Sequence, residues 1–193
     1  MDMESSPVEG DALGAALLAH LEEGEAGSIH VVERDDGYVT IDSGKPYFSG
    51  AGGWFPVEES FAESAHGRVL DIGAGAGRFS LDLQNRGHEV LALDVSPGCL
   101  EVCRRRGIGE LFHGTIFDLA RTGSDSFDTF LLMGHNIGLL ASPEMAPQFL
   151  STLASLARPG ATIVGTSRDP FATNDPIHLG YHQMNRDRGR PPG

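Results

Sequence analysis

The stretch VLDIGAGAGRF, at residues 69–79, limits what this chain can fold into more than any other part of the sequence. It begins as an apolar run, contains an acid, Asp71, and continues with Gly73, Gly75 and Gly77 before a helix-like segment. A buried strand, a glycine turn and a helix in this order form a corner that binds anions or nucleotides. Glycines let the backbone approach such a ligand without collision by side chains. The stretch therefore predicts a ligand site at the exit of a strand.

The chain from residue 68 onward alternates between strand-like and helix-like segments. Apolar runs predict strands at 68–73 and 88–96, within 109–119, within 126–140, and at 161–167. Helices are predicted between them at 77–87, 97–107 and 142–160, the last effective from Pro147. Strands that alternate with helices favour right-handed crossovers and a parallel sheet. We therefore expect an α/β fold: a Rossmann-like, doubly wound, mainly parallel sheet in a three-layer α/β/α arrangement.

The first third of the chain has a different character. Leucines on one helical face predict a helix over 11–23, and the alternation on both sides of Asp36-Gly37 predicts a β-hairpin over 28–42. An aromatic, glycine-rich loop follows, and then a helix over 57–67 that Gly67 closes. We expect two domains: an N-terminal acidic cap of helix, hairpin and loop over 1–55, and the Rossmann-like domain over 56–193.

Negative charge is concentrated in the same front part. Residues 1–66 hold fourteen acids against two basic residues, residues 67–193 are nearly balanced, and the formal net charge is −13. Such a surface repels phosphate backbones, so no nucleic-acid partner is expected. No apolar run approaches the roughly 20 residues of a membrane span, and the acidic N-terminus lacks the basic head of a secretory signal. We expect a soluble, cytoplasmic protein with no membrane partner.

Metal binding is not expected either. Cys99 and Cys103 stand four residues apart in a predicted helix, and a metal site would need more ligands nearby. Five histidines show no spacing that suggests a metal site: His20, His30, His66, His88 and His178. The two cysteines are therefore interpreted as reduced packing residues.

The spacing of the glycines discriminates between ligands. A dinucleotide fingerprint, G-x-G-x-x-G, counted from Gly73 ends on Arg78, and counted from Gly75 it ends on Ser80. A phosphate-binding P-loop fails because no Gly-Lys-Ser/Thr follows. The match to a nicotinamide-dependent oxidoreductase is therefore imperfect, and that reading remains the weakest of the alternatives.

The stretch resembles the first motif of class I S-adenosylmethionine-dependent methyltransferases. That motif is an acid, one residue and then G-x-G-x-G after the first strand, and here it is formed by Asp71 and the three glycines. The family also has an acid at the end of the second strand for the ribose hydroxyls, and Asp94 stands there. The resemblance covers roughly residues 56–169. It implies S-adenosylmethionine as cofactor, S-adenosylhomocysteine as product, and a small-molecule substrate.

The resemblance also implies a role for each residue of the cofactor site. Asp71 would lie near the methionine ammonium, Asp94 would bind the ribose, and Val95 would pack on the adenine. Other backbone and side-chain contacts are expected from Gly73, Ala74, Gly75 and Gly77 at the glycine turn, from Thr115 and Ile116 at the end of the third strand, and from Met133 and Gly134 at the end of the fourth. Thr115 departs from the family, which often has an acid at that place for the adenine amino group.

Catalytic candidates follow the fourth strand in MGHNIG, residues 133–138. His135 could take a proton from the acceptor and Asn136 could orient it; the alternative is that both satisfy backbone groups of a turn. Tyr181 and His182 follow the fifth strand, on the side where substrates enter in this fold. Tyr47 and Trp54 could form a lid over cofactor and substrate, or could pack the front layer against the core.

The C-terminal part is short for this family, whose sheet has seven strands. Only 26 residues with four prolines follow Ser167, and the tail NRDRGRPPG resembles a loop. We therefore expect the last two strands to be missing, which leaves the fifth strand as an exposed edge open to homodimerisation or poor solubility. The expected function is methyl transfer to an oxygen or nitrogen of a small-molecule metabolite. The alternative is a homologue that binds S-adenosylmethionine without transfer, as a scaffold or regulatory subunit.

Overall fold

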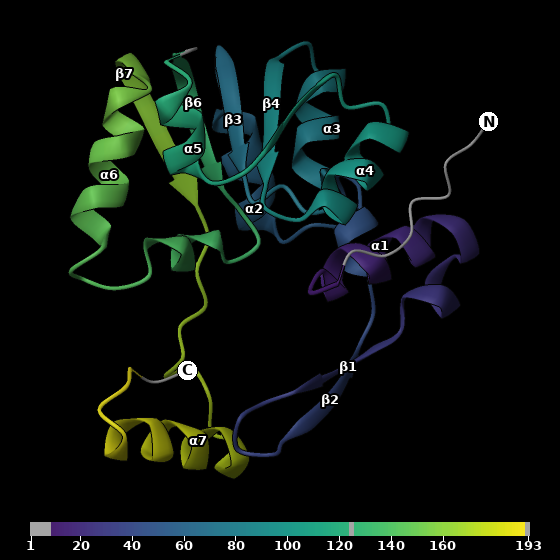
Figure 1. Cartoon of the computed structure of the whole chain (residues 1–193), viewed down its shortest axis with the longest axis vertical. Coiled ribbons are helices and arrows are strands. Elements are labelled where there is room, and N and C mark those ends of the chain that lie inside the picture. The colour runs from purple at the N-terminus through teal and green to yellow at the C-terminus, as the bar shows by residue number, and fades with distance from the viewer. Residues whose placement is uncertain (1–8, 124–125, 192–193) are drawn as a thin grey trace.

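The computed structural model describes residues 9–123 and 126–191. Its centre is a five-stranded sheet in the order β5-β4-β3-β6-β7, in which neighbouring strands are parallel (Figure 1). The strands are β3 (Arg68–Ile72), β4 (Glu89–Asp94), β5 (Glu110–His113), β6 (Phe127–Leu132) and β7 (Ala157–Gly165). This confirms the predicted Rossmann-like parallel sheet.

Helices cover both faces of the sheet. They are α2 (Pro56–Ser64), α3 (Arg78–Asn85), α4 (Pro97–Arg105), α5 (Ile116–Arg121) and α6 (Ala146–Ser155). Alternate residues of each strand point to opposite faces. Leu70 of β3 and Phe130 of β6 pack on the side of α5 and α6, whereas Val69 and Leu131 pack with residues of α2 and α3. The helices therefore bury both apolar faces of the strands.

The strand order reverses at β3. The chain continues from β3 to β4 on one side and returns to β6 on the other. In open parallel sheets a ligand crevice forms at such a switch point, outside the carboxyl ends of the strands. The glycine stretch 73–77 leaves β3 at this place.

The N-terminal part consists of α1 (Ala12–Glu23), the 3₁₀ helix η1 (Glu25–Ser28), the hairpin β1 (His30–Glu33) and β2 (Val39–Asp42), and the 3₁₀ helix η2 (Lys45–Phe48). The predicted helix and hairpin are thus present, with Val31 opposite Ile41. Asp11 joins this part to the sheet domain, because its carboxylate accepts hydrogen bonds from Gly14 N of α1 and from Gly98 N of α4 at 3.0 and 2.9 Å.

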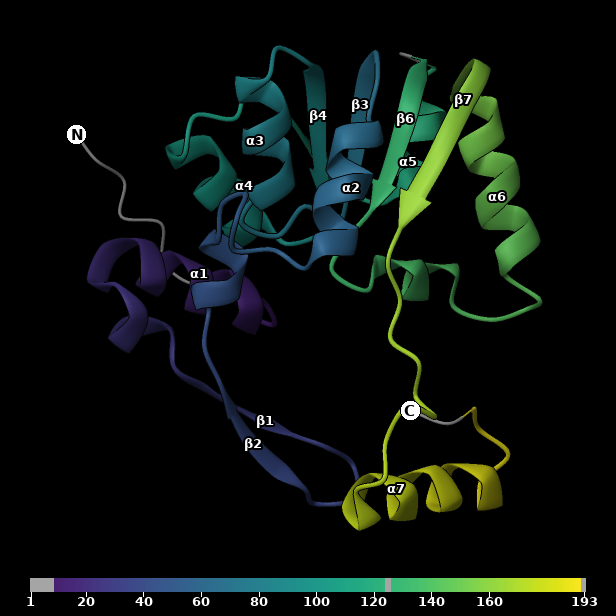
Figure 2. The ribbon, with the colours of Figure 1, turned by 180° about the vertical axis from the view of Figure 1, so that it is seen from behind.

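The last helix, α7 (Pro176–Asp187), lies apart from the sheet. Both views show it below the carboxyl ends of the strands, beside the tip of the hairpin (Figures 1 and 2). No helix was assigned to these residues from the sequence, and the tail interpreted as a loop overlaps the last turn of α7 at 185–187. The signal was nevertheless present, since Asp175 caps the helix through Ile177 N at 2.8 Å and Pro176 occupies its first turn. A domain boundary at residue 55 stays a prediction.

Three element boundaries differ from those predicted. The region 109–119 holds a strand and the start of a helix, because Gly114 adopts φ 148° and Thr115 caps α5. The helix expected over 142–160 ends at Ser155, and β7 begins at Ala157, opposite Phe127. β7 forms one edge of the sheet, and dimerisation through that edge stays a prediction. Within the described residues, no helix combines the length and apolarity needed to cross a membrane.

Candidate functional site

The glycine turn after β3 has a backbone that only glycine adopts easily. Gly73, Gly75 and Gly77 have φ of 74°, 57° and 70°, in the left-handed region. The turn is held to β4, since Gly73 N and Ala74 N donate to Leu93 O at 2.8 and 3.1 Å. A Cβ on Gly73 would lie 2.5 Å from Asn136 Nδ2. A side chain at position 73 would therefore collide with Asn136.

Asp94 connects the end of β4 to this turn. Its Oδ2 accepts a hydrogen bond from Gly75 N at 2.8 Å, and its Oδ1 accepts one from Ser96 N at 2.9 Å. The next side chain, Val95, is 63% exposed. The predicted ribose acid and the predicted adenine contact thus lie side by side at the switch point, next to the glycine turn.

Asp71 lies beneath the turn, fully inside the protein. Ser80 Oγ donates a 2.6 Å hydrogen bond to its Oδ2. Burial raises the pKa of Asp71 to about 6, with the hydrogen bond from Ser80 opposing the rise and the negative charge of Asp94 adding to it. The structure therefore shows a buried carboxyl at the base of the corner, and its contact with a ligand ammonium stays a prediction.

The segment after β6 forms the opposite wall. Met133 is buried, and Gly134 turns the chain with φ 65°. His135 is exposed and has φ 75°, which is uncommon for a residue with a side chain and is concentrated at functional sites. Asn136 Nδ2 donates to Ile72 O and Gly73 O at 2.9 and 2.8 Å. His135 is thus open to solvent at the switch point, whereas Asn136 satisfies backbone carbonyls at the end of β3.

The two lid candidates occupy different places. Tyr47, on η2, covers the glycine turn, because a Cβ on Gly75 would lie 3.2 Å from Tyr47 Cδ1. Trp54 is 7% exposed, and its ring packs on Phe79 with centroids 4.5 Å apart. Its indole N–H donates to Ser49 O at 3.0 Å. Tyr47 therefore lies at the candidate site, and Trp54 packs the front layer against the core.

Thr115 and Ile116 lie at the start of α5, where Thr115 caps the helix and Ile116 is its first residue. The Thr115 hydroxyl caps the helix by accepting from Asp118 N at 3.2 Å, and it donates to Asp118 Oδ2 at 2.5 Å. Ile116 is 3% exposed and belongs to the core against the sheet. Thr115 lies two residues beyond the end of β5 rather than in it, so an adenine contact from its hydroxyl stays a prediction.

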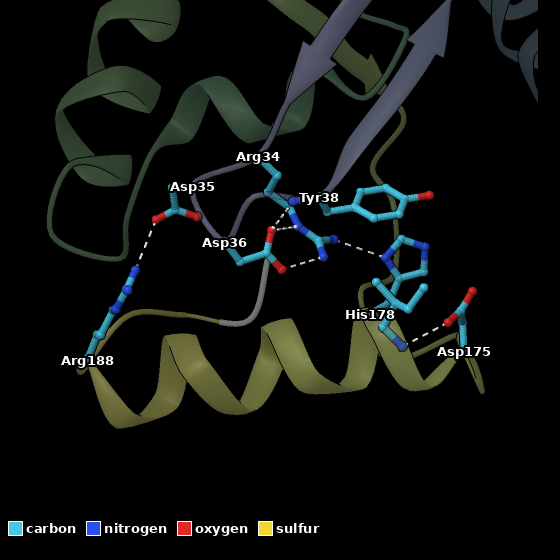
Figure 3. Close-up of polar contacts among 8 residues, drawn as sticks. Arg34, Asp35, Asp36, Tyr38, Asp175, His178 and Arg188 are labelled. Atoms are coloured by element: carbon cyan, nitrogen blue, oxygen red, sulfur yellow. Dashed lines mark hydrogen bonds and ion pairs between the residues drawn. The ribbon is translucent and has the colours of Figure 1, made fainter.

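Tyr181 and His182 lie on α7, beside the hairpin rather than beside the glycine turn (Figures 1 and 2). Arg34 of the hairpin tip has its guanidinium carbon 4.0 Å from the Tyr181 ring centroid. Figure 3 shows Arg34 donating to His178 Nδ1, at 3.1 Å, and Asp35 paired with Arg188, at 3.2 Å. The structure thus joins α7 to the hairpin, and a substrate role for Tyr181 or His182 stays a prediction.

An ion pair that was not predicted from the sequence lies at the corner. Arg78, which starts α3, pairs through Nη2 with Glu58 Oε1 of α2 at 2.7 Å, and the two side chains are 17% and 6% exposed. A signal for Glu58 existed, since it stands three residues after Phe55 and its Oε2 accepts from Phe55 N at 3.1 Å, as in a capping box. Among residues 9–123 and 126–191, no group of three or more His, Cys, Asp or Glu side chains could hold a metal ion.

Residues 69–160 match the family described as "Methyltransferase domain". A crystal structure of an S-adenosylmethionine-dependent methyltransferase from Bacteroides fragilis, in complex with S-adenosylhomocysteine, superimposes with a TM-score of 0.69. The two chains are 28% identical, and the match covers 82% of this chain and 65% of that one.

Two curated proteins match about half of this chain. The demethylmenaquinone methyltransferase of Clavibacter sepedonicus is 36% identical over 101 residues, which are 50% of this chain and 39% of that protein. The ubiquinone biosynthesis O-methyltransferase of Hahella chejuensis is 30% identical over 101 residues, 50% of this chain and 41% of that protein. This chain therefore spans much less than two thirds of these relatives. Residues 69–160 are thus similar to the methyltransferase domain family, and the chain has the class I methyltransferase fold.

Proposed function

We propose that this chain is an S-adenosylmethionine-dependent methyltransferase that transfers a methyl group to an oxygen or nitrogen of a small-molecule metabolite. The observation that carries the proposal is the corner at the switch point, where Asp94 Oδ2 accepts from Gly75 N at 2.8 Å inside the matched region 69–160. At this corner the glycine backbone lies beside the Asp94 carboxylate, which can accept hydrogen bonds from ribose hydroxyls.

The residues present suit this cofactor. A Cβ on Gly73 or Gly75 would crowd Asn136 or Tyr47, so glycine at these positions lets the two side chains lie close to the backbone of the turn. Asp94 would hold the ribose, exposed Val95 would face the adenine, and Asp71 would lie below the amino-acid end. These groups fit a ligand that joins a nucleoside to a charged amino acid.

When bound, the cofactor would supply a methyl group activated on a sulfonium. The protein then needs to align the acceptor and keep water away from it. His135, exposed at the end of β6, would take the proton that a hydroxyl or a protonated amine loses. Tyr47 would cover the corner from the N-terminal side.

An oxygen acceptor is supported by one of the two curated relatives, which is named a ubiquinone biosynthesis O-methyltransferase. The other is named a demethylmenaquinone methyltransferase and does not support an oxygen or nitrogen acceptor. The acidic front part of this chain favours a neutral or cationic acceptor over an anionic one. A small phenol or amine is therefore the first class of acceptor to test.

Calorimetric titration with S-adenosylmethionine and S-adenosylhomocysteine tests the cofactor assignment. We expect both to bind the wild-type chain and Asp94→Ala to weaken both by about 10-fold or more, because a buried acceptor is lost. Asp187→Ala, an exposed acid on α7, is the matched control and is expected to bind as the wild type does. Absence of binding to folded wild-type protein would contradict the assignment.

A second candidate, cofactor binding without transfer, is favoured by one observation. The Asn136 amide nitrogen is used by two backbone carbonyls, which removes its donors from an acceptor molecule. Incorporation of a labelled methyl group into a panel of phenols and amines separates the two candidates. Incorporation that falls in His135→Ala, at unchanged cofactor affinity, would support transfer with His135 as the base.

A further inference from the structure

Arg78 places a positive charge at the corner. It follows Gly77 directly as the first residue of α3. Its Nη2 lies 4.0 Å from the position that a Cβ on Gly134 would take. Since Gly134 follows the end of β6 and Arg78 follows the glycine turn after β3, the guanidinium reaches from the start of α3 to the segment that follows β6.

The guanidinium is held from one side. Glu58 Oε1 lies 2.7 Å from Nη2, the ring of Phe79 lies 4.3 Å from the guanidinium carbon, and Ser49 Oγ lies at a long 3.4 Å from Nη1. Arginine has five N–H donors in a planar fork that suits a carboxylate. In the part of the chain that the structure describes, its one short hydrogen bond is the bond to Glu58. The fork therefore has donor capacity for a further anion.

The positive charge of Arg78 acts on Asp71, at the base of the corner, and on Tyr47, which covers the glycine turn. Burial raises the pKa of Asp71 and of Tyr47, and the positive charge of Arg78 opposes the rise in both. Asp71 and Asp94 suit the ammonium and the ribose of a ligand, but neither can bind a carboxylate. A cation beside these two acids favours binding of the carboxylate at a zwitterionic amino-acid end, and Arg78 supplies one.

We propose that Arg78 binds the carboxylate at the amino-acid end of the cofactor, and that Glu58 is the positioning residue that holds the guanidinium in place. This inference rests on the proposed function. Glu58 suits its role because it is 5% exposed and fixed at both oxygens, by Arg78 at one and by Phe55 N at the other. Without the Glu58 carboxylate, the Arg78 guanidinium would still be present but would no longer be held in one orientation.

The test compares S-adenosylmethionine with decarboxylated S-adenosylmethionine, which lacks only the carboxylate, by calorimetry. We expect the wild-type chain to prefer the intact cofactor by about 10- to 100-fold, the ratio that one charge-assisted hydrogen-bonded pair supplies. In Arg78→Met the preference should vanish, through weaker binding of the intact cofactor alone. Arg78→Lys should keep part of it, and Glu58→Gln should lower it while binding of the decarboxylated compound stays unchanged.

Arg86→Met is the matched control, since Arg86 is an ion-paired arginine at the other end of α3. It should keep the full preference. Equal affinity of the wild type for the two compounds, or equal loss of both in Arg78→Met, would overturn the role of Arg78. Binding of neither compound to the folded wild type would instead overturn the proposed function. If Arg78→Met does not fold, the Lys and Gln variants decide: an unchanged preference in both overturns the inference.

Discussion

The sheet domain is stabilised internally by buried apolar side chains. The lobe formed by the hairpin and α7 is stabilised internally by polar and cation–π contacts. Within the sheet domain, side chains such as Phe127, Phe130 and Leu131 are at most 1% exposed. In the lobe, β1 and β2 contain no buried residue, and the buried residues of α7 are His182 and Asn185. The lobe is joined instead by the half-buried Arg34, whose guanidinium lies on the Tyr181 ring, and by exposed ion pairs of Asp35 with Arg188 and Arg190, the first of which is drawn in Figure 3. Exposed ion pairs contribute little to stability.

Because of this difference, we expect the sheet domain to be rigid and the lobe to be the more mobile of the two regions. The cofactor corner is built on buried strands, so its geometry is fixed before a ligand arrives. A lone two-stranded hairpin is marginal in water, and elements with few buried contacts open locally at low free energy. We therefore expect changes in the sheet domain to act on global stability and changes in the lobe to act on local opening.

The largest effect is expected from Phe130→Ala, in the core beneath α5 and α6. Truncation of a fully buried phenylalanine leaves a cavity and costs about 3–5 kcal/mol of unfolding free energy. Ile177→Ala on α7, where the side chain is 52% exposed, should change it by no more than about 0.5 kcal/mol. Urea unfolding monitored by circular dichroism measures both. Similar losses at the two positions would remove the distinction between the regions.

The next effect concerns the buried acid of the corner. Because burial raises the pKa of Asp71 to about 6, the folded protein holds this proton more tightly than the unfolded chain does. The stabilisation from that proton is complete below pH about 4 and is lost as pH rises through about 6. Asp71→Asn should therefore equal the wild type in stability at pH 4 and exceed it by about 3 kcal/mol at pH 8.

Urea unfolding at the two pH values checks this prediction, and Asp42→Asn on the exposed hairpin is its control. The same Asp71 variant should bind S-adenosylhomocysteine more weakly, because the negative charge below the amino-acid end is gone. A gain of stability that does not depend on pH would show that the Asp71 carboxyl is not the titrating group.

The corner was predictable from sequence because its information is local. The spacing of Gly73, Gly75 and Gly77, and the acid at the end of the next strand, specify a turn that needs left-handed backbone and a carboxylate beside it. The parallel arrangement of the sheet followed from the alternation of strands and helices, whereas the order of its strands came from the structure. Neither inference needed a contact between distant residues.

The lobe was not predictable because its contacts join residues about 150 positions apart. Nothing near Arg34 in the sequence indicates that it lies on the Tyr181 ring, and the four C-terminal prolines concealed α7 although Pro176 starts it. The role of Asn136 was not predictable either, because its amide donates hydrogen bonds to the distant Ile72 O and Gly73 O. Side-chain roles that depend on tertiary contacts had to come from the structure.

The two regions also differ in what a glycine does. Gly73 and Gly37 both have positive φ, 74° and 83°, but a Cβ on Gly73 would lie 2.5 Å from Asn136 Nδ2, whereas a Cβ on Gly37 would meet nothing within 4 Å. Gly37→Ala should therefore cost only the backbone strain, about 1 kcal/mol, and Gly73→Ala about 2 kcal/mol or more. Urea unfolding measures the difference, and equal costs would mean that Asn136 moves aside freely.

The smallest effect is expected in the lobe itself, from Arg34→Met. The variant keeps the length of the side chain and removes the cation that lies on the Tyr38 and Tyr181 rings, at 4.7 and 4.0 Å. Amide hydrogen exchange in α7 should quicken about 5-fold, the factor that corresponds to about 1 kcal/mol from the cation–π contact with Tyr181, while exchange in β3 and β6 stays unchanged. Arg121→Met, an exposed arginine on α5, should leave exchange in α7 as it is. Faster exchange in the sheet as well would mean that the lobe and the sheet domain unfold as one unit, and unchanged exchange in α7 would show that Arg34 does not hold the helix.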